Sequence, residues 1–244
     1  MSTVSRPVRS RSTPGVQPGR LTLVTDRFQL VVPPEVRTLE GFRAWATADD
    51  FPERVRVTFL DGEVHLDMSN EEINTHVGLK TRVSSTLDFL VKQRKLGKFY
   101  GDGVLLVNEE GQVSNNPDAV FLSRASLEAR QVRLVPRKGA EHLYRELEGT
   151  PDWVLEVVSD SSVQKDTVRL REGYHRAGIP EYWLVDGRGE EVVFQILNHR
   201  KTGYGASPVR DGWQRSKVFG ASFRLERTLD DFGLWDYTLH TRPE

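Results

Sequence analysis

The chain has 244 residues and a mass of 27.8 kDa, enough for one large domain or two small ones with a sizeable core. It contains no cysteine, which excludes disulfides, thiolate metal sites and cysteine nucleophiles. Its 34 basic and 35 acidic residues give a net charge of -1, without the positive excess of a strong nucleic-acid binder. No apolar run approaches the ~20 residues that span a bilayer, so we expect a cytoplasmic protein without a membrane partner.

Residues 1–20 differ in composition from the rest of the chain. They are rich in Ser, Thr, Pro, Gly and Arg, and they include four arginines and no acid. This composition predicts a disordered basic tail. Without these four arginines, 30 basic residues remain against the same 35 acidic ones, a net charge of -5. We interpret residues 21–244 as a single domain, with a core over about 54–197 and a C-terminal extension over 198–244.

Three elements are expected in the first part of this domain. A short helix is predicted from Leu39 to Ala48. Two strands follow, Arg54–Leu60 and Glu63–Met68, and the Asp61-Gly62 pair between them is typical of a hairpin turn. The second strand alternates, so its polar residues would form a solvated face: Glu63, His65 and Asp67.

The apolar period then changes, which predicts a long amphipathic helix from Glu71 to about Leu96. Its apolar face would comprise Ile73, Val77, Leu87, Leu90 and Val91. His76 and Lys80 fall on or beside this face. A buried histidine usually only satisfies a hydrogen bond, and a lysine there extends its amine to solvent. A role in the chemistry is the less common alternative for both residues.

The second half of the domain predicts a mixed sheet. Strands are expected over 103–108 and 118–122, and the charged segment 123–149 is expected to be irregular and partly helical. The nearly all-apolar run 152–159 is typical of a strand covered on both faces. A helix over about 164–177 leads to strands over 181–185 and 190–197, which flank a hairpin turn at 186–189. This strand–helix–strand spacing fits a crossover between parallel strands, so the fold class is α/β with added antiparallel hairpins.

Two acidic residues stand out because they lie in apolar strands. Glu156 interrupts the run Val154-Leu155-Glu156-Val157-Val158, where a carboxylate is costly to bury unless it is paired, protonated or bound to a metal. Asp118 opens another apolar strand directly after Asn116-Pro117. Two acids on neighbouring strands can share one Mg²⁺ or Mn²⁺ with a phosphate oxygen, so we predict that Asp118 and Glu156 bind a metal.

Asp152 is a competing partner for Glu156, since both point to the same face of one strand. Four residues at ~3.3 Å each place them about 13 Å apart, too far to share one ion. We therefore interpret Asp152 as a strand-start or turn residue.

Several segments together resemble a known family. They are Asn116-Pro117-Asp118-Ala119-Val120-Phe121, the run TPDWVLEVVS over 150–159, Lys165-Asp166 through Tyr174, and AGIPEYWLVD over 177–186. This set resembles the bacterial Uma-type restriction endonuclease family of the PD-(D/E)XK nuclease superfamily, over roughly half the chain. The resemblance implies a restriction-endonuclease-like mixed sheet flanked by helices. It also implies that Asp118 is the metal-binding Asp and Glu156 the second acid, and His76 matches a histidine common on the family's long helix.

The chain departs from this family at the lysine. The superfamily pattern has a lysine two residues after the second acid, where this chain has Val158, and the family's usual alternative aligns with Leu170. We expect Lys165 to serve instead, with Arg169 or Lys80 as substitutes and Glu63 as a further accessory residue. A cation there would orient the attacking water and offset charge in the transition state.

Three functional hypotheses follow. The first is a metal-dependent endonuclease acting on nucleic acid, with DNA as the expected substrate and a homodimer compatible with cutting both strands. The second is a catalytically idle relative that binds nucleic acid or a protein, which the missing lysines and the acidic body favour. A metabolic enzyme on a similar sheet is the weakest, because the chain has no phosphate-binding Gly loop, zinc motif or Ser-His-Asp signature. The C-terminal aromatics would pack in the core, cover a sheet edge or form a dimer contact.

Overall fold

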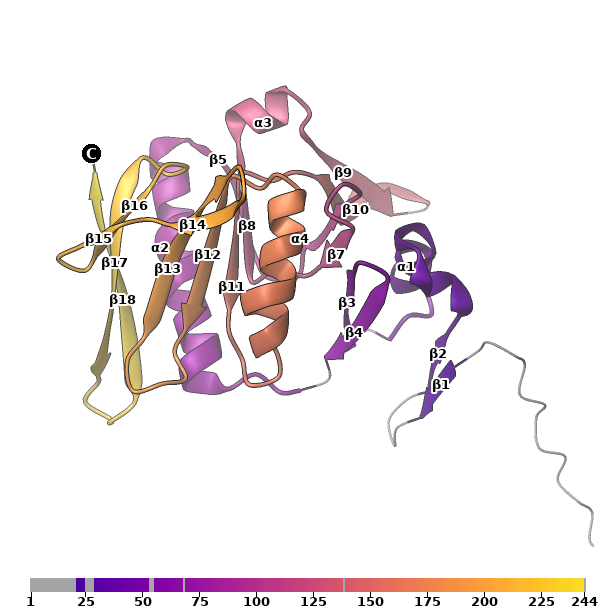
Figure 1. The fold of residues 1–244 in the computed structure, drawn as a ribbon, viewed down its shortest axis with the longest axis horizontal. Helices are drawn as coiled ribbons and strands as arrows, with labels where there is room; N and C mark the ends of the chain where they lie inside the picture. The colour runs from indigo at the N-terminus through magenta and orange to yellow at the C-terminus, as the bar shows by residue number, and fades with distance from the viewer. Residues whose placement is uncertain (1–20, 25–28, 53–54, 68, 138, 244) are drawn as a thin grey trace, which may run out of the picture.

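The computed structural model describes residues 21–24, 29–52, 55–67, 69–137 and 139–243 (Figure 1). The tail predicted over 1–20 and the Arg54 and Met68 ends of two predicted strands lie outside these residues. The chain has the predicted α/β architecture, with two six-stranded mixed sheets at its centre. Within the described residues, none of the helices is both long and apolar enough to cross a membrane.

The first six-stranded sheet positions most of the site. Its strands, in spatial order, are β14 (Gly203–Ala206), β13 (Val193–Arg200), β12 (Glu181–Asp186), β11 (Trp153–Val157), β8 (Ala119–Ser123) and β5 (Gly97–Gly101). β11 and β12 are parallel, and the other neighbours are antiparallel. The parallel pair requires a crossover, which the π-helical turn η3 (Lys165–Arg169) and helix α4 (Leu170–Arg176) provide. The predicted strand–helix–strand unit is confirmed.

One face of this sheet is covered by helix α2 (Leu79–Arg94), which follows the π-helical turn η2 (Ile73–Gly78). A four-stranded antiparallel sheet packs beside it, with β15 (Val209–Arg210), β16 (Trp213–Ser216), β17 (Ala221–Leu229) and β18 (Trp235–Pro243). The core between these layers includes Leu87, Trp183 and Phe223. Of the C-terminal aromatics, Phe219, Phe223 and Tyr237 therefore pack in the core, whereas Phe232 is 87% exposed.

The opposite face is covered by α4, and beyond it lies the second six-stranded sheet (Figure 1). This sheet contains β4 (Glu63–Asp67), β3 (Arg56–Leu60), β7 (Val113–Asn115), β6 (Leu105–Asn108), β10 (Ala140–Gly149) and β9 (Val132–Arg137). Leu170 and Tyr174 of α4 pack in one core with Val154 of the first sheet and Leu60 of the second.

The remaining elements cover the outer part of the second sheet. They are the hairpin of β1 (Leu21–Val24) and β2 (Gln29–Val32), the 3-10 turn η1 (Pro34–Arg37) and helix α1 (Leu39–Ala46). The short helix α3 (Arg124–Glu128) instead contacts β5 and β8 of the first sheet and β9 of the second. Phe42 of α1 packs against Phe59 of β3 in a third core. The hairpin and helix predicted before Glu71 are thereby confirmed over their described residues.

The predicted apolar face of the long helix is wrong at its start. Ile73 is 75% exposed and Val77 is 36% exposed, whereas the buried face comprises Leu79, Val83, Leu87, Leu90 and Val91. A π-helical turn is wider than an α-helical one, so residues before it lose the phase of the helix that follows. In the segment 123–149, expected to be irregular and partly helical, the structure has the helix α3 and adds the strands β9 and β10.

Candidate active site

A cavity of about 360 Å³ lies where the carboxyl end of β11, the start of β8, the strand β4 and the turn η3 meet. Asp118 and Glu156 both line it, together with His76, Lys165 and Asp166. The two acids that the sequence singled out thus face the same space. His65 and Asp67 of β4 also line this cavity, and the His65 side chain is 37% exposed.

Asp118 is held rigidly at the start of β8. Its backbone N–H donates to the carbonyl of Leu155, and its carboxylate Oδ2 accepts a hydrogen bond of 2.7 Å from the N–H of Val157. The residue is 7% exposed. Because both bonds come from β11, the strand that bears Glu156 also positions Asp118.

Glu156 is buried and has specific polar partners. Its Oε1 accepts hydrogen bonds from the Tyr174 hydroxyl at 2.6 Å and from the Asn115 amide at 2.9 Å. Within the described residues, Oε2 accepts none. Burial raises the pKa of Glu156 well above its usual value, and the nearby charges of Asp166 and Asp118 add to that rise against the opposing charge of Lys165. A cation in the cavity would favour the charged form.

Lys165 supplies a positive charge to the same cavity. Its Nζ lies 3.3 Å from Oδ1 of Asp166, whose other oxygen accepts a hydrogen bond from the Ser162 hydroxyl. Burial would lower the pKa of Lys165, but the carboxylates of Asp166 and Glu156 outweigh it and raise that pKa. Lys165 is therefore a charged donor beside Glu156.

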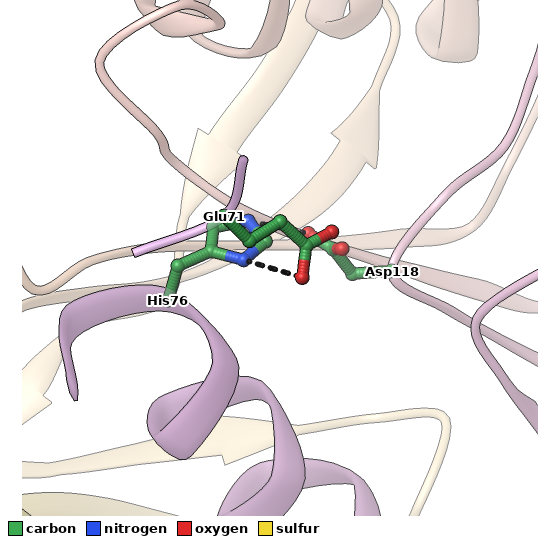
Figure 2. A group of neighbouring side chains, drawn as sticks. All are labelled: Glu71, His76 and Asp118. Atoms are coloured by element: carbon green, nitrogen blue, oxygen red, sulfur yellow. Dashed lines mark ion pairs between the residues drawn. The ribbon is translucent and has the colours of Figure 1, made fainter. Parts of the chain in front are cut away.

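His76 lies between two carboxylates (Figure 2). Its Nε2 is 3.7 Å from Oδ2 of Asp118, and its Nδ1 is 3.4 Å from Oε2 of Glu71. Neither contact is a hydrogen bond, and Nδ1 is buried without a hydrogen-bond partner among the described residues. The His76 side chain, 7% exposed, thus offers a ring nitrogen toward Glu71 and another toward Asp118.

These three residues have a donor set that fits a divalent metal. One ligand atom from each of Glu71, His76 and Asp118 can be chosen so that all lie within 4.8 Å of one another. Carboxylate oxygens suit Mg²⁺ and Mn²⁺, and an imidazole nitrogen extends the set toward transition metals. The unpartnered Nδ1 of His76 is the observation that supports this fit, since a buried ring nitrogen is normally bonded.

Lys80 is close to these carboxylates but on a different side. Its Nζ is 3.0 Å from Oε2 of Glu71, 3.1 Å from Asp102 and 3.4 Å from Oδ1 of Asp118. It lines a separate open depression with Asp102 and does not line the cavity that contains Glu156. Lys80 therefore neutralises the carboxylates of Glu71 and Asp118 from outside the cavity that contains Glu156.

The other predicted accessory residues lie elsewhere. Glu63 and Arg169 form an exposed ion pair at 2.6 Å and do not line the cavity. Asp152 accepts hydrogen bonds from Ser123 N–H and the Ser126 hydroxyl, which agrees with its interpretation as a turn residue. Val158 and Leu170, the positions of the missing lysines, are both fully buried in the apolar core around α4.

Four site residues were not predicted: Glu71, Asn115, Asp166 and Tyr174. Asp166 and Tyr174 both belong to the resembling segment, but no site role was predicted for either. Asn115 accepts a hydrogen bond of 2.7 Å from the Thr58 hydroxyl and donates to both Glu156 and Tyr174. A buried Asn next to the conspicuous Asn116-Pro117-Asp118 segment was the available signal.

The fold is similar to a crystal structure described as "a putative nuclease belonging to DUF820 from Anabaena variabilis", with a TM-score of 0.54 and 14% sequence identity. The match covers 75% of this chain and 90% of that chain. Identity this low shows the fold alone. None of the curated proteins matches the chain. The chain therefore has a mixed-sheet α/β fold similar to that of this structure.

The sequence profile of the Uma2 family, described as "Putative restriction endonuclease", matches residues 39–233. The matched range spans more than half of the chain, from α1 to the loop before β18. The protein belongs to the Uma2 restriction endonuclease family. The resemblance predicted from the segments around Asp118 and Glu156 is confirmed.

Proposed function

We propose that this protein is a metal-dependent endonuclease that hydrolyses phosphodiester bonds, with DNA as its substrate. The observation that carries the proposal is that Asp118, Glu156 and Lys165 line one cavity although they come from three different elements. Two carboxylates and one cation are the groups that metal-assisted phosphodiester hydrolysis requires. The family membership supports the same conclusion.

Asp118 and Glu156 would hold Mg²⁺ or Mn²⁺. His76 and Glu71, which lie next to Asp118, would be further ligands of the ion. Such an ion lowers the pKa of a bound water and neutralises charge on a phosphate. Asn115 and Tyr174 both bond Oε1 of Glu156, so they would orient its Oε2 toward the cavity for this purpose.

Lys165 would act on the attacking water and the phosphate. Its amine is charged and is held by Asp166, which itself is buried and bonded by Ser162. An ammonium group donates up to three hydrogen bonds, so it can orient a water for in-line attack and stabilise negative charge that develops on the phosphate. This role replaces the lysines missing at Val158 and Leu170.

A catalytically idle relative is the second candidate function. It is favoured by one observation: Val158 and Leu170 are core residues, so the chain has no lysine at either usual position. Such a protein would retain the metal site and bind nucleic acid without cutting it.

One experiment separates the two candidates. Calorimetry measures Mg²⁺ and Mn²⁺ binding by the wild type, Asp118→Asn and Glu156→Gln, and the same samples are incubated with plasmid and single-stranded DNA. Binding and cleavage that are both lost in the two variants support the nuclease. Binding without cleavage supports the idle relative, and absence of metal binding contradicts the proposed site. Light scattering on the same samples tests for a homodimer.

A further inference from the structure

A basic groove lies apart from the active site. It encloses about 510 Å³ and, among the residues that the structure describes, is lined by five cationic residues and no acidic one. The cations are Arg200, Arg210, Arg215, Lys217 and Arg242. The whole chain has a net charge of -1, so this concentration of positive charge is local. A volume within the roughly 300–1,000 Å³ of ligand sites leaves room for more than one phosphate.

Two of these cations, Arg242 and Arg200, pack against neighbouring groups. The guanidinium of Arg242 lies 4.7 Å from the ring centroid of Trp213, and Arg224 lies over the same ring at 5.4 Å. Arg200 donates to the carbonyl of Ala206 and lies flat over Gly205, where a Cβ would come within 2.2 Å of its Nε. Stacking on an aromatic ring leaves the N–H edge of a guanidinium available to an anion.

The groove and the active site occupy opposite ends and opposite faces of the first sheet. Asn198, which lines the groove, pairs with Glu181 at the start of β12, whereas Glu156 pairs with Leu184 near its end. Asn198 shares its strand face with Ile196, which packs under the four-stranded sheet. Glu156 shares its face with Val154, which packs under α4.

We infer that this groove binds the phosphodiester backbone of nucleic acid at a distance from the cutting site. Five cations lining one groove suit a run of phosphates better than a single one, and the polar side chains of Asn198, Ser207 and Ser222 add hydrogen-bonding groups. The choice of nucleic acid as the anion rests on the proposed function. The groove would anchor the substrate electrostatically, since the cavity itself is lined by five acidic residues and only two lysine or arginine residues among those described.

The test measures binding of labelled single-stranded and duplex DNA to the full chain by fluorescence anisotropy, with a chelator present so that no metal-dependent cutting occurs. The groove variant is Arg210→Gln/Lys217→Gln/Arg242→Gln. The control, Lys95→Gln/Lys98→Gln/Arg124→Gln, makes the same change in charge at another exposed surface. We expect the groove variant to bind about tenfold or more weakly, with a salt slope reduced by about 2 to 3, and the control to stay within about twofold.

Equal losses in both variants would overturn the inference, because they would indicate long-range charge rather than a site. So would unchanged binding by the groove variant, or binding of inorganic tripolyphosphate without binding of DNA. Cleavage with Mg²⁺ distinguishes the two proposals. If the groove variant binds DNA more weakly but the wild type never cuts DNA, only the proposed nuclease function is contradicted. If the wild type cuts DNA and the groove variant binds it equally well, only the proposed role of the groove is contradicted.

Discussion

The carboxylate of Asp118 accepts a hydrogen bond from the backbone N–H of Val157 over 2.7 Å. Val157 directly follows Glu156 in β11, so the bond fixes the two acids of the site relative to each other. Asp118 therefore has two roles, as a candidate metal ligand and as the acceptor for a buried N–H. Different substitutions separate these roles.

Asp118→Asn and Asp118→Ala both remove the charge, but only the asparagine keeps a side-chain oxygen for Val157. We expect both variants to lose metal binding. Asp118→Ala should also lose about 1–3 kcal/mol of unfolding free energy relative to Asp118→Asn, because it leaves a buried donor unpaired. Urea unfolding in chelator measures this difference. Equal stability of the two variants would show that the bond to Val157 contributes nothing.

Lys165→Met should slow cleavage strongly while leaving metal affinity within a few-fold of the wild type. The reason is that Lys165 lines the cavity but contributes no ligand atom to a metal. Removing a transition-state donor of this kind costs about 10²–10³ in rate. Arg169→Met is the matched control, since Arg169 lies one turn further along and pairs with Glu63 outside the cavity. Comparable cleavage by the two variants would contradict the assignment of Lys165.

Lys80→Met should change the stability of the metal-free protein and its metal affinity, the quantity that Lys165→Met should leave nearly unchanged. Burial disfavours the charge of Lys80, but the carboxylates around it outweigh this effect and raise its pKa. Removing the cation from a largely buried cluster should destabilise the metal-free protein by about 3–5 kcal/mol. It should also increase Mn²⁺ affinity, because Lys80 competes with a metal for Glu71 and Asp118.

Lys92→Met is the control for this substitution, because Lys92 lies in the same helix and pairs with Asp88 at the exposed surface. We expect less than about 0.5 kcal/mol of change there. Calorimetry and thermal unfolding give both quantities, and a lower Mn²⁺ affinity of Lys80→Met would contradict the prediction.

Asp118 and Glu156 could be predicted from the sequence because their chemistry conflicts with their surroundings. A carboxylate in an apolar strand needs a compensating partner, so the anomaly itself identifies the residue. The shared cavity followed from placing the two on neighbouring strands, which the pairing of β8 with β11 confirms. That they hold a metal stays a prediction.

The rest of the site depends on contacts that no local pattern contains. Glu71 lies before a π-helical turn that breaks the helical period, so its position relative to His76 could not be derived from spacing. Asn115 ends β7, a strand of three residues that is too short to show alternation. Its bonds to Glu156 and Tyr174 arise only because the two six-stranded sheets pack on either side of α4.

Tyr174→Phe tests how this packing positions Glu156. The Tyr174 hydroxyl donates to Glu156 and favours the charged carboxylate, against burial, which raises the pKa of Glu156. Removing the hydroxyl should raise that pKa further. Metal binding requires the carboxylate, so the pH at which Mn²⁺ affinity is half-maximal should move upward.

Tyr204→Phe is the matched control, because it also deletes a buried hydroxyl, one that bonds the carbonyl of Ile179 away from the site. Both variants should lose about 1 kcal/mol of stability. Only Tyr174→Phe should shift the pH profile, and a shared shift would assign it to altered packing rather than to the bond with Glu156.

Glu71→Gln should make the metal-free protein less stable at neutral pH but not at acidic pH. Burial alone would raise the pKa of Glu71, but hydrogen bonds from Lys80 and Arg56 outweigh it and lower the pKa from 4.5 to about 2. A carboxyl with a depressed folded-state pKa contributes stability above its unfolded pKa, and this contribution is lost as pH falls toward the folded value.

The gap between wild type and Glu71→Gln should therefore be about 1–3 kcal/mol at neutral pH and should narrow between pH 4.5 and about 2. Urea unfolding at several pH values in chelator measures it. Glu110→Gln, at an exposed position, should track the wild type throughout. A gap that stays constant with pH would mean that the ion pairs of Glu71 with Lys80 and Arg56 do not stabilise the fold, and that the charge of Lys80 is balanced by Asp102 and Asp118 instead.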